Sequence, residues 1–186
     1  SKADTEALHL SDALQIPKVR WVLDYLHQIQ ARPEPIQRRV VVVSEFTSVL
    51  HMIQRVLMHR NIDNALYTGT TSRLRRTLIK ESFVHATDLC VLLLSKSAGG
   101  IGLSLEAGSM ILYEPHFNYA KDAQTIGRVQ RLGQTHAVDI HFLCMGDGID
   151  KKLRKTQLQK VHESRKYKNI MDREDHKELS DDTLHE

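Results

Sequence analysis

Three polar side chains in the second half of the sequence have a spacing that suits phosphate binding. Gln124, Arg128 and Arg131 are four and three positions apart, so within one helix they would share a face. Guanidinium groups are rigid forks of donors that match phosphate oxygens. An arginine that stabilises the charge on a transferred γ-phosphate raises the rate by about 10³- to 10⁵-fold. Two exposed arginines on a helix surface are the alternative explanation of this spacing.

A glycine-rich segment is the second candidate site. Gly99, Gly100 and Gly102 follow the most apolar run of the chain, after the four residues Ser95 to Ala98, which include Lys96. Glycines let a backbone approach a ligand closely, and such a loop can hold a phosphate of a nucleotide or of a nucleic-acid strand. The sequence contains no G-x-x-x-x-G-K-S/T pattern, and the third glycine of G-x-G-x-x-G is absent. Neither a phosphate-binding P-loop nor a dinucleotide-binding fold is therefore indicated.

Hydrophobic patterning predicts the elements that position these residues. Short apolar runs, typical of strands buried on both faces of a parallel sheet, alternate with amphipathic stretches of helical period. This order predicts an α/β fold, a doubly wound, mainly parallel sheet with helices on both faces. We expect strands at residues 40–43, 65–67, 89–94, 110–113 and 138–143, and helices over 16–29, 46–57, 73–83 after a Ser72 cap, and 120–131.

The predicted sheet brings several polar segments to one edge. Ligands of such sheets bind at the carboxyl ends of the strands. Ser44, the turn Thr68–Thr71, the glycine segment and Glu114 each follow a predicted strand. We therefore expect these residues to lie close together in the folded chain.

Composition narrows the class of protein. The 186 residues are 41% hydrophobic, 26% charged and 5% aromatic, which is typical of a globular domain. The longest apolar run, residues 89–94, is much shorter than the roughly 18 residues that a membrane span needs. Cys90 and Cys144 stand far apart with no other cysteine, so we expect no disulfide framework, no thiolate metal site and a reducing compartment.

Charge is distributed unevenly and suggests where the units begin and end. Residues 151–168 carry eight basic residues and one acidic residue, whereas residues 169–186 carry two and seven. A basic helix can follow a phosphate backbone or be an ordinary solvated helix face, and an acidic segment without apolar period is expected to be disordered. We expect a lead-in helix at 1–36, a globular unit at 37–148, a basic helix at 149–168 and an acidic tail at 169–186.

The order of these motifs resembles the second RecA-like lobe of the Swi/Snf-like ATPases of helicase superfamily two. The resemblance extends from Val40 to Leu143, and the expected fold is therefore RecA-like, with a C-terminal helical extension. Five segments carry it in order: VVVSEFTSVL at 41–50, TGTT at 68–71, LLSKSAGGIGLSL at 93–105, ILYEPHFN at 111–118 and QTIGRVQRLGQ at 124–134.

The resemblance implies half of an ATP-driven motor that translocates on double-stranded DNA in chromatin remodelling or DNA repair. It implies a nuclear protein that uses ATP and Mg²⁺, with the Mg²⁺ ligands supplied by an N-terminal RecA-like lobe of the same chain. Its expected partners are that lobe, duplex DNA and chromatin proteins, and no membrane. The 186-residue fragment alone is expected to be inactive.

The same resemblance assigns roles to individual residues. Arg128 and Arg131 would be catalytic arginine fingers, and Gln124, Gly100 and Gly102 would bind the nucleotide. The alternative is a degenerate lobe that only binds nucleic acid or protein, because Gly127 stands where the family usually has an acid and Gln130 where a histidine is common. The residues expected at DNA are Ser44, Thr68, Gly69, Thr70, Ser95, Lys96 and Gly99.

Overall fold

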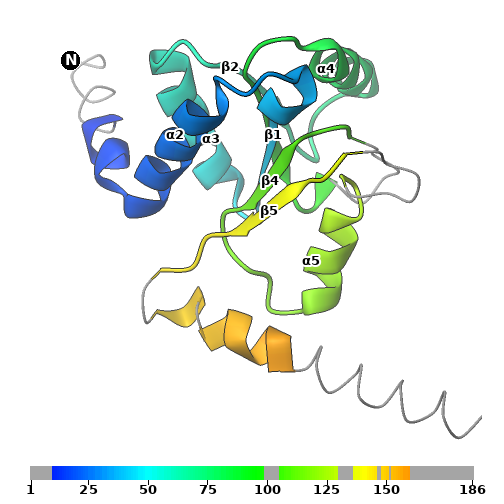
Figure 1. The fold of residues 1–186 in the computed structure, drawn as a ribbon. Helices are drawn as coiled ribbons and strands as arrows, with labels where there is room; N and C mark the ends of the chain where they lie inside the picture. The colour runs from blue at the N-terminus through cyan, green and yellow to red at the C-terminus, as the bar shows by residue number, and fades with distance from the viewer. Residues whose placement is uncertain (1–9, 99–104, 130–135, 146–147, 151, 160–186) are drawn as a thin grey trace, which may run out of the picture.

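A computed structural model describes residues 10–98, 105–129, 136–145, 148–150 and 152–159 of the chain. It contains one five-stranded sheet, in which every pair of neighbouring strands is parallel and the order is β2-β3-β1-β4-β5. Figure 1 shows this sheet between helices. The strands are β1 (Arg39–Ser44), β2 (Asp63–Tyr67), β3 (Cys90–Ser95), β4 (Ser109–Leu112) and β5 (Asp139–Phe142).

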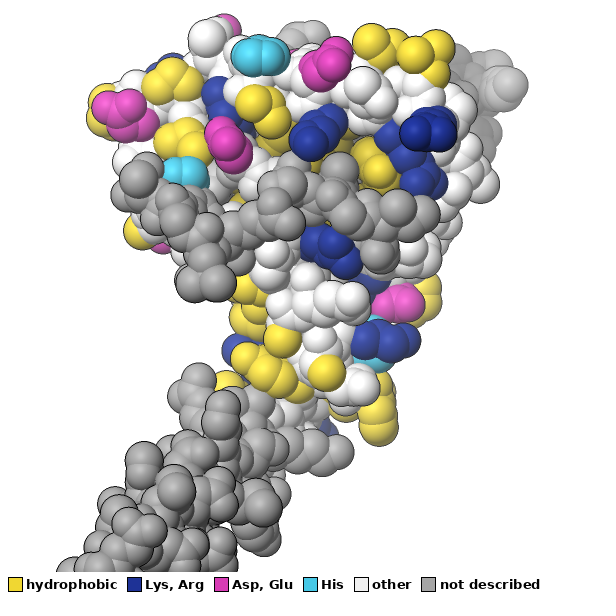
Figure 2. All heavy atoms as spheres, turned by 90° about the vertical axis from the view of Figure 1, so that its right-hand side faces the viewer, with side chains coloured by type: hydrophobic (Ala, Val, Ile, Leu, Met, Phe, Trp, Pro, Cys, Tyr) yellow, Lys and Arg dark blue, Asp and Glu magenta, His cyan; other side chains and the backbone are white. Residues whose placement is uncertain are grey.

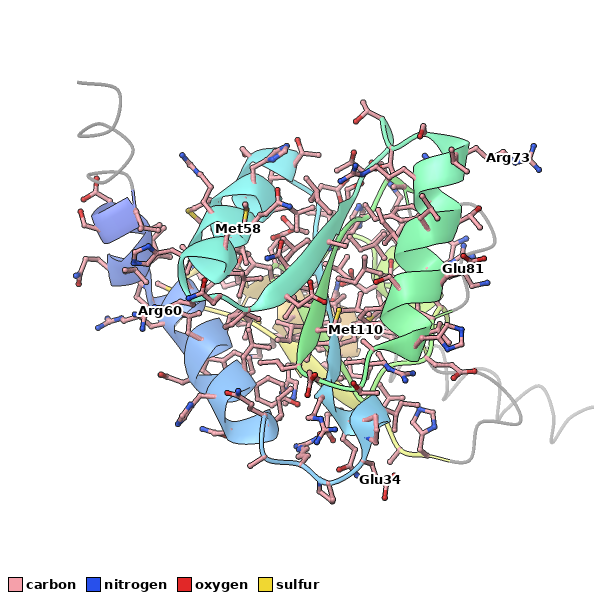
Figure 3. All side chains as sticks on the ribbon, turned by 90° about the horizontal axis from the view of Figure 1, so that it is seen from above. Glu34, Met58, Arg60, Arg73, Glu81 and Met110 are labelled. Carbon is pink, nitrogen blue, oxygen red and sulfur yellow. The ribbon has the colours of Figure 1, made fainter. Side chains whose placement is uncertain are left out.

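Helices cover both faces of the sheet, as the sequence predicts. Figure 3 shows α2 and α3 on one side, α4 on the other and Met110 of β4 between them. A helical segment at 149–150 and 152–159, called here the C-terminal helical segment, follows β5. The helices are α2 (Pro17–Ile29), α3 (Thr47–His59), α4 (Arg73–His85) and α5 (Tyr119–Ile126), with a 3₁₀ turn η1 (Pro35–Arg38) before β1.

The valine run of β1 explains why both faces are covered. Val40 to Val43 are all fully buried, and alternate side chains of a strand point to opposite faces. Val40 and Val42 pack in the core formed with α2 and α3, whereas Val41 and Val43 pack in the core that includes Phe83 of α4. The prediction of a doubly buried parallel strand is confirmed.

Two helix ends differ from the sequence prediction. Phe46 was expected on the apolar face of the second helix, but it is the N-cap of α3 and its side chain is 59% exposed. The helix expected over 120–131 ends at Ile126, and Gly127 is its C-cap. Ser72, by contrast, caps α4 as predicted, because its hydroxyl accepts a hydrogen bond from the Arg75 amide.

Gly108 joins the lead-in region to the sheet by close backbone contact. Its N–H donates to the carbonyl of Ile36 at 2.8 Å, and its carbonyl accepts from the Asp139 N–H at 2.9 Å. A Cβ at this position would lie 2.5 Å from the Cα of Gln37. Only glycine therefore fits here without a backbone shift.

Replacing Gly108 by alanine is expected to lower the free energy of unfolding of the 186-residue chain by about 2–3 kcal/mol, because overpacking forces the backbone to move. Urea denaturation measures the change. Gly69→Ala is the matched control, since a Cβ at Gly69 meets no atom within 4 Å and its effect should stay within about 0.5 kcal/mol. Equal midpoints for the two variants would contradict the packing argument.

Among the described residues, no helix is long and apolar enough to cross a membrane.

Candidate functional site at the carboxyl edge of the sheet

The carboxyl ends of the strands bring together most of the described polar residues that the sequence singled out. Ser44 and Ser95 are paired in register at the ends of β1 and β3. The backbone continues this pairing, because the Lys96 N–H donates to the Ser44 carbonyl at 3.0 Å. Glu114 follows β4 and reaches Ser44 directly. The expected convergence on one edge is confirmed for these residues.

Glu114 is a half-buried acceptor at the centre of this edge. Its carboxylate accepts hydrogen bonds from the Ser44 hydroxyl at 3.1 Å and from the Glu45 N–H. Burial raises the pKa of Glu114 above its ordinary value, although the Glu45 amide, Lys96 and Ser44 oppose the rise. Ser44 is itself fully buried. Its hydroxyl therefore orders the chain after β1 from inside the protein.

The turn after β2 is held by an arginine that sequence reasoning missed. Arg76 of α4 donates from Nε to the carbonyl of Thr71 at 2.8 Å and from Nη2 to that of Gly69 at 3.0 Å. Its guanidinium also lies over the Tyr67 ring, 5.1 Å from the centroid. Thr68 is buried, whereas Gly69 and Thr70 are exposed. The exposed part of the turn is thus fixed in place and accessible.

Ser95 orders the start of the glycine segment. Its side chain is fully buried, its hydroxyl oxygen lies 3.3 Å from that of Ser97, and it accepts a hydrogen bond from the Ala98 N–H. The predicted residues Gly99, Gly100 and Gly102 lie outside the described residues.

Lys96 points inward in this structure. Its ammonium donates to the Glu114 carbonyl at 2.9 Å and lies 3.2 Å from Asp122 Oδ1. The side chain of Lys96 is only 5% exposed, and that of Asp122 is fully buried. A direct contact between Lys96 and DNA, as the sequence predicts, would require this ion pair to open.

The segment that carries the first predicted arginine finger is a turn and not a helix. Gly127 ends α5, and the Arg128 N–H donates to the Thr125 carbonyl. The carbonyl of Arg128 accepts from the Leu105 N–H at 3.1 Å. The predicted helical stripe of Gln124, Arg128 and Arg131 is therefore wrong at Arg128, whereas Gln124 lies on α5 as predicted and Arg131 lies outside the described residues.

Two causes explain why α5 is short. Glycine costs a helix interior about 1 kcal/mol relative to alanine, so Gly127 weakens the helix at this point. The second cause is the hydrogen bond from the Leu105 N–H, which connects the Arg128 carbonyl to a segment that is distant in the sequence. Because Leu105 directly follows residues 99–104, this bond joins the end of the glycine segment to the Arg128 turn. Gln124 remains on α5 and is exposed.

The described residues offer no cluster suited to a metal ion: no group of three His, Cys, Asp or Glu side chains could hold one. Glu114 and Asp122 are committed to internal hydrogen bonds.

The family of the chain follows from its sequence together with this fold. The sequence model of the family described as "Helicase conserved C-terminal domain" matches residues 17–133. The chain belongs to this family. The matched range extends from α2 past the Arg128 turn and so includes every site residue described above.

Relatives in fungi place the chain among the Swi/Snf-like ATPases. "DNA repair protein rad8" of Schizosaccharomyces pombe is 33% identical over 148 residues, which are 79% of this chain and 13% of that protein. "DNA repair protein RAD5" of Yarrowia lipolytica is 33% identical over 159 residues, 85% of this chain and 15% of the relative. "Chromatin-remodeling ATPase INO80" of Emericella nidulans is 32% identical over 123 residues, 66% of this chain and 8% of the relative. The chain thus spans less than a sixth of each relative.

A solved structure confirms the RecA-like fold. The "Crystal structure of the C-terminal part of Fun30 ATPase domain" superposes with a TM-score of 0.70 at 30% identity, covering 77% of this chain and 46% of that one. The predicted α/β fold class and the predicted family are both confirmed.

Proposed function

We propose that this chain is the second motor lobe of an ATP-dependent translocase on double-stranded DNA that acts in DNA repair or chromatin remodelling in the nucleus. The observation that carries the proposal is the family match over residues 17–133, on a fold whose carboxyl edge joins the expected nucleotide and DNA segments. The Leu105–Arg128 hydrogen bond supplies the link between them.

The nucleotide side of the lobe is formed by the end of α5 and the glycine segment. Arg128 and Arg131 act as arginine fingers, which stabilise the negative charge that develops on the transferred phosphoryl group. Gln124, Gly100 and Gly102 complete the nucleotide contacts. ATP and Mg²⁺ bind between this lobe and an N-terminal RecA-like lobe of the same protein, which supplies the metal ligands.

The DNA side is formed by the turn after β2 and by the strand ends. Gly69 and Thr70 present exposed backbone, Thr68 lies beneath them, and Gly99 and Lys96 lie at the start of the glycine segment. Ser44 and Ser95 support these loops from inside. Contacts of this kind to phosphates position a protein on a duplex without reading its sequence.

The surface around α4 supports DNA binding electrostatically. Figure 2 shows Lys and Arg side chains gathered on the upper part of this face of the molecule. Arg73, Arg75 and Lys80 of α4 are exposed and follow directly after the turn Thr68–Thr71. A concentration of positive charge attracts a nucleic-acid backbone.

The test compares ATP hydrolysis by the full-length protein with that of the 186-residue fragment, each with and without duplex DNA. We expect DNA to stimulate hydrolysis by the full-length protein, and the fragment to show none. Absence of hydrolysis in both would favour the degenerate binding lobe, for which Gly127 at the end of α5 is the supporting observation. Binding of the fragment to chromatin proteins would then be the next measurement.

A further inference from the structure

A fully buried carboxylate on α5 connects three parts of the chain. Asp122 Oδ2 accepts hydrogen bonds from the His116 N–H at 2.8 Å and from Gln157 Nε2 at 3.1 Å. Its other oxygen pairs with the Lys96 ammonium at 3.2 Å, as an ion pair without hydrogen-bond geometry. These neighbours come from the loop before α5, the C-terminal helical segment and the start of the glycine segment.

Gln157 is the only one of these neighbours that lies beyond the region matched by the family model. It is 2% exposed, and its Nε2 also donates to the His116 carbonyl. Its Oε1 accepts from Arg154 Nη1 at 3.1 Å. The Arg154 guanidinium lies over the Phe142 ring of β5, 3.6 Å from the centroid. The amide of Gln157 is therefore fixed at both of its polar atoms.

The C-terminal helical segment is also fastened near its beginning. Asp150 pairs with the ammonium of Lys18 on α2, and the same ammonium donates to the Tyr113 carbonyl at 2.8 Å. The segment thus has one anchor on α2 and one on α5. Figure 1 shows this segment as the orange helix below the sheet.

A buried charge keeps its partners in one arrangement, because leaving it unpaired in a low-dielectric interior is costly. Asp122 lies on α5, whose end continues into the Arg128 turn. Lys96 lies three residues before Gly99. The position of the Arg128 turn relative to Lys96 and Leu105 therefore depends on two links: the Leu105–Arg128 backbone bond and the Lys96–Asp122 pair.

We propose that Gln157 is a positioning residue for ATP hydrolysis: by holding Asp122 in place against Lys96 it keeps α5, and with it the Arg128 turn, in position at the carboxyl edge of the sheet. This inference rests on the proposed function and extends it to a helix outside the matched domain. Gln157 acts through Asp122 and Lys96 and contacts neither nucleotide nor DNA.

The experiment measures DNA-stimulated hydrolysis by the full-length protein carrying Gln157→Met, which keeps the length of the side chain and removes its donor. A misplacement of catalytic groups by about 1 Å can reduce the rate by about a hundredfold. We expect kcat to fall by about ten- to a hundredfold, while the KM for ATP and the affinity for duplex DNA change by less than about twofold. Gln159→Met is the matched control, because Gln159 is exposed on the same helical segment and its substitution should leave kcat unchanged.

The outcomes separate this inference from the proposed function. A Gln157→Met protein with a lower melting temperature but unchanged kcat and KM would show a purely structural role and overturn the inference. A wild-type protein without DNA-stimulated hydrolysis would overturn the proposed function as well. If Gln157→Met does not fold, Arg154→Met tests the same link, because it removes the donor to Gln157 Oε1, together with the guanidinium over the Phe142 ring, and leaves the Gln157 donor to Asp122 in place. We expect it to lower kcat severalfold, and an unchanged kcat would overturn the inference.

Discussion

Arg131→Ala in the full-length protein is expected to abolish ATP turnover while duplex DNA binding remains. An arginine finger contributes about 10³- to 10⁵-fold to the rate of phosphoryl transfer, because it stabilises charge that exists only in the transition state. DNA binding rests on many phosphate contacts elsewhere on the lobe, so the loss of one arginine at the nucleotide should change it little. Steady-state hydrolysis at saturating duplex DNA, together with fluorescence anisotropy of labelled DNA, measures both properties.

The control for this experiment is Arg55→Ala. Arg55 is an exposed arginine of α3, a helix that packs with α2 on the face of the sheet opposite α4. The Arg55→Ala substitution removes the same charge without changing the carboxyl edge, so ATP turnover should stay within about twofold of the wild-type value. Unchanged turnover in Arg131→Ala would remove the finger assignment and leave Arg128 as the remaining candidate.

Local patterns in the sequence were sufficient for the sheet and for most helix positions. The valine run of β1 identified a strand covered on both sides, and it lies between β3 and β4 at the centre of the sheet. Ser72 identified the start of α4 because a capping hydroxyl acts on an amide only three residues away. Features of this kind depend on near neighbours in the sequence and can be recognised without a fold.

The end of α5 could not be predicted in the same way. In the sequence a helical stripe continues through Arg128 and Arg131. Gly127 by itself lowers the stability of a helix only modestly. The turn depends in addition on the Leu105 amide, which only the tertiary fold brings to the Arg128 carbonyl. A tertiary contact therefore helps to set the end of α5, whereas the helical period of the sequence placed this end too far along the chain.

The ion pair of Lys96 with Asp122 could not be predicted from the sequence either. In the sequence Lys96 stands in a serine- and glycine-rich segment and appears solvent-facing, and Asp122 resembles an ordinary acid in the first turn of a helix. Their proximity follows from the order of the strands, because β3 and the segment before α5 end at the same edge. No sequence signal marked Gln157, whose partner Asp122 is 35 positions away.

The ion pair of Lys96 and Asp122 leads to the second large expected effect. Asp122→Asn in the 186-residue chain is expected to lower the free energy of unfolding by about 3–5 kcal/mol, because it removes the carboxylate that pairs with the buried Lys96 ammonium. The asparagine side chain also replaces one carboxylate oxygen by an amide donor beside the ammonium or the Gln157 amide. Chemical denaturation monitored by circular dichroism gives the midpoint and the slope.

The double variant Lys96→Met/Asp122→Asn separates the buried charge from the loss of a contact. Removing both charges leaves no unpaired ion, and buried ion pairs replaced by neutral groups of similar size are often close to neutral in stability. We therefore expect the double variant to be more stable than Asp122→Asn alone by about 1–3 kcal/mol, a coupling within the range seen for residues in contact. Lys121→Met and Asp24→Asn, both at exposed positions, are the matched single controls and should each stay within about 0.5 kcal/mol of wild type. A double variant less stable than Asp122→Asn alone would show that the two side chains stabilise the lobe independently, and the register of α5 would then depend on the Leu105–Arg128 bond instead.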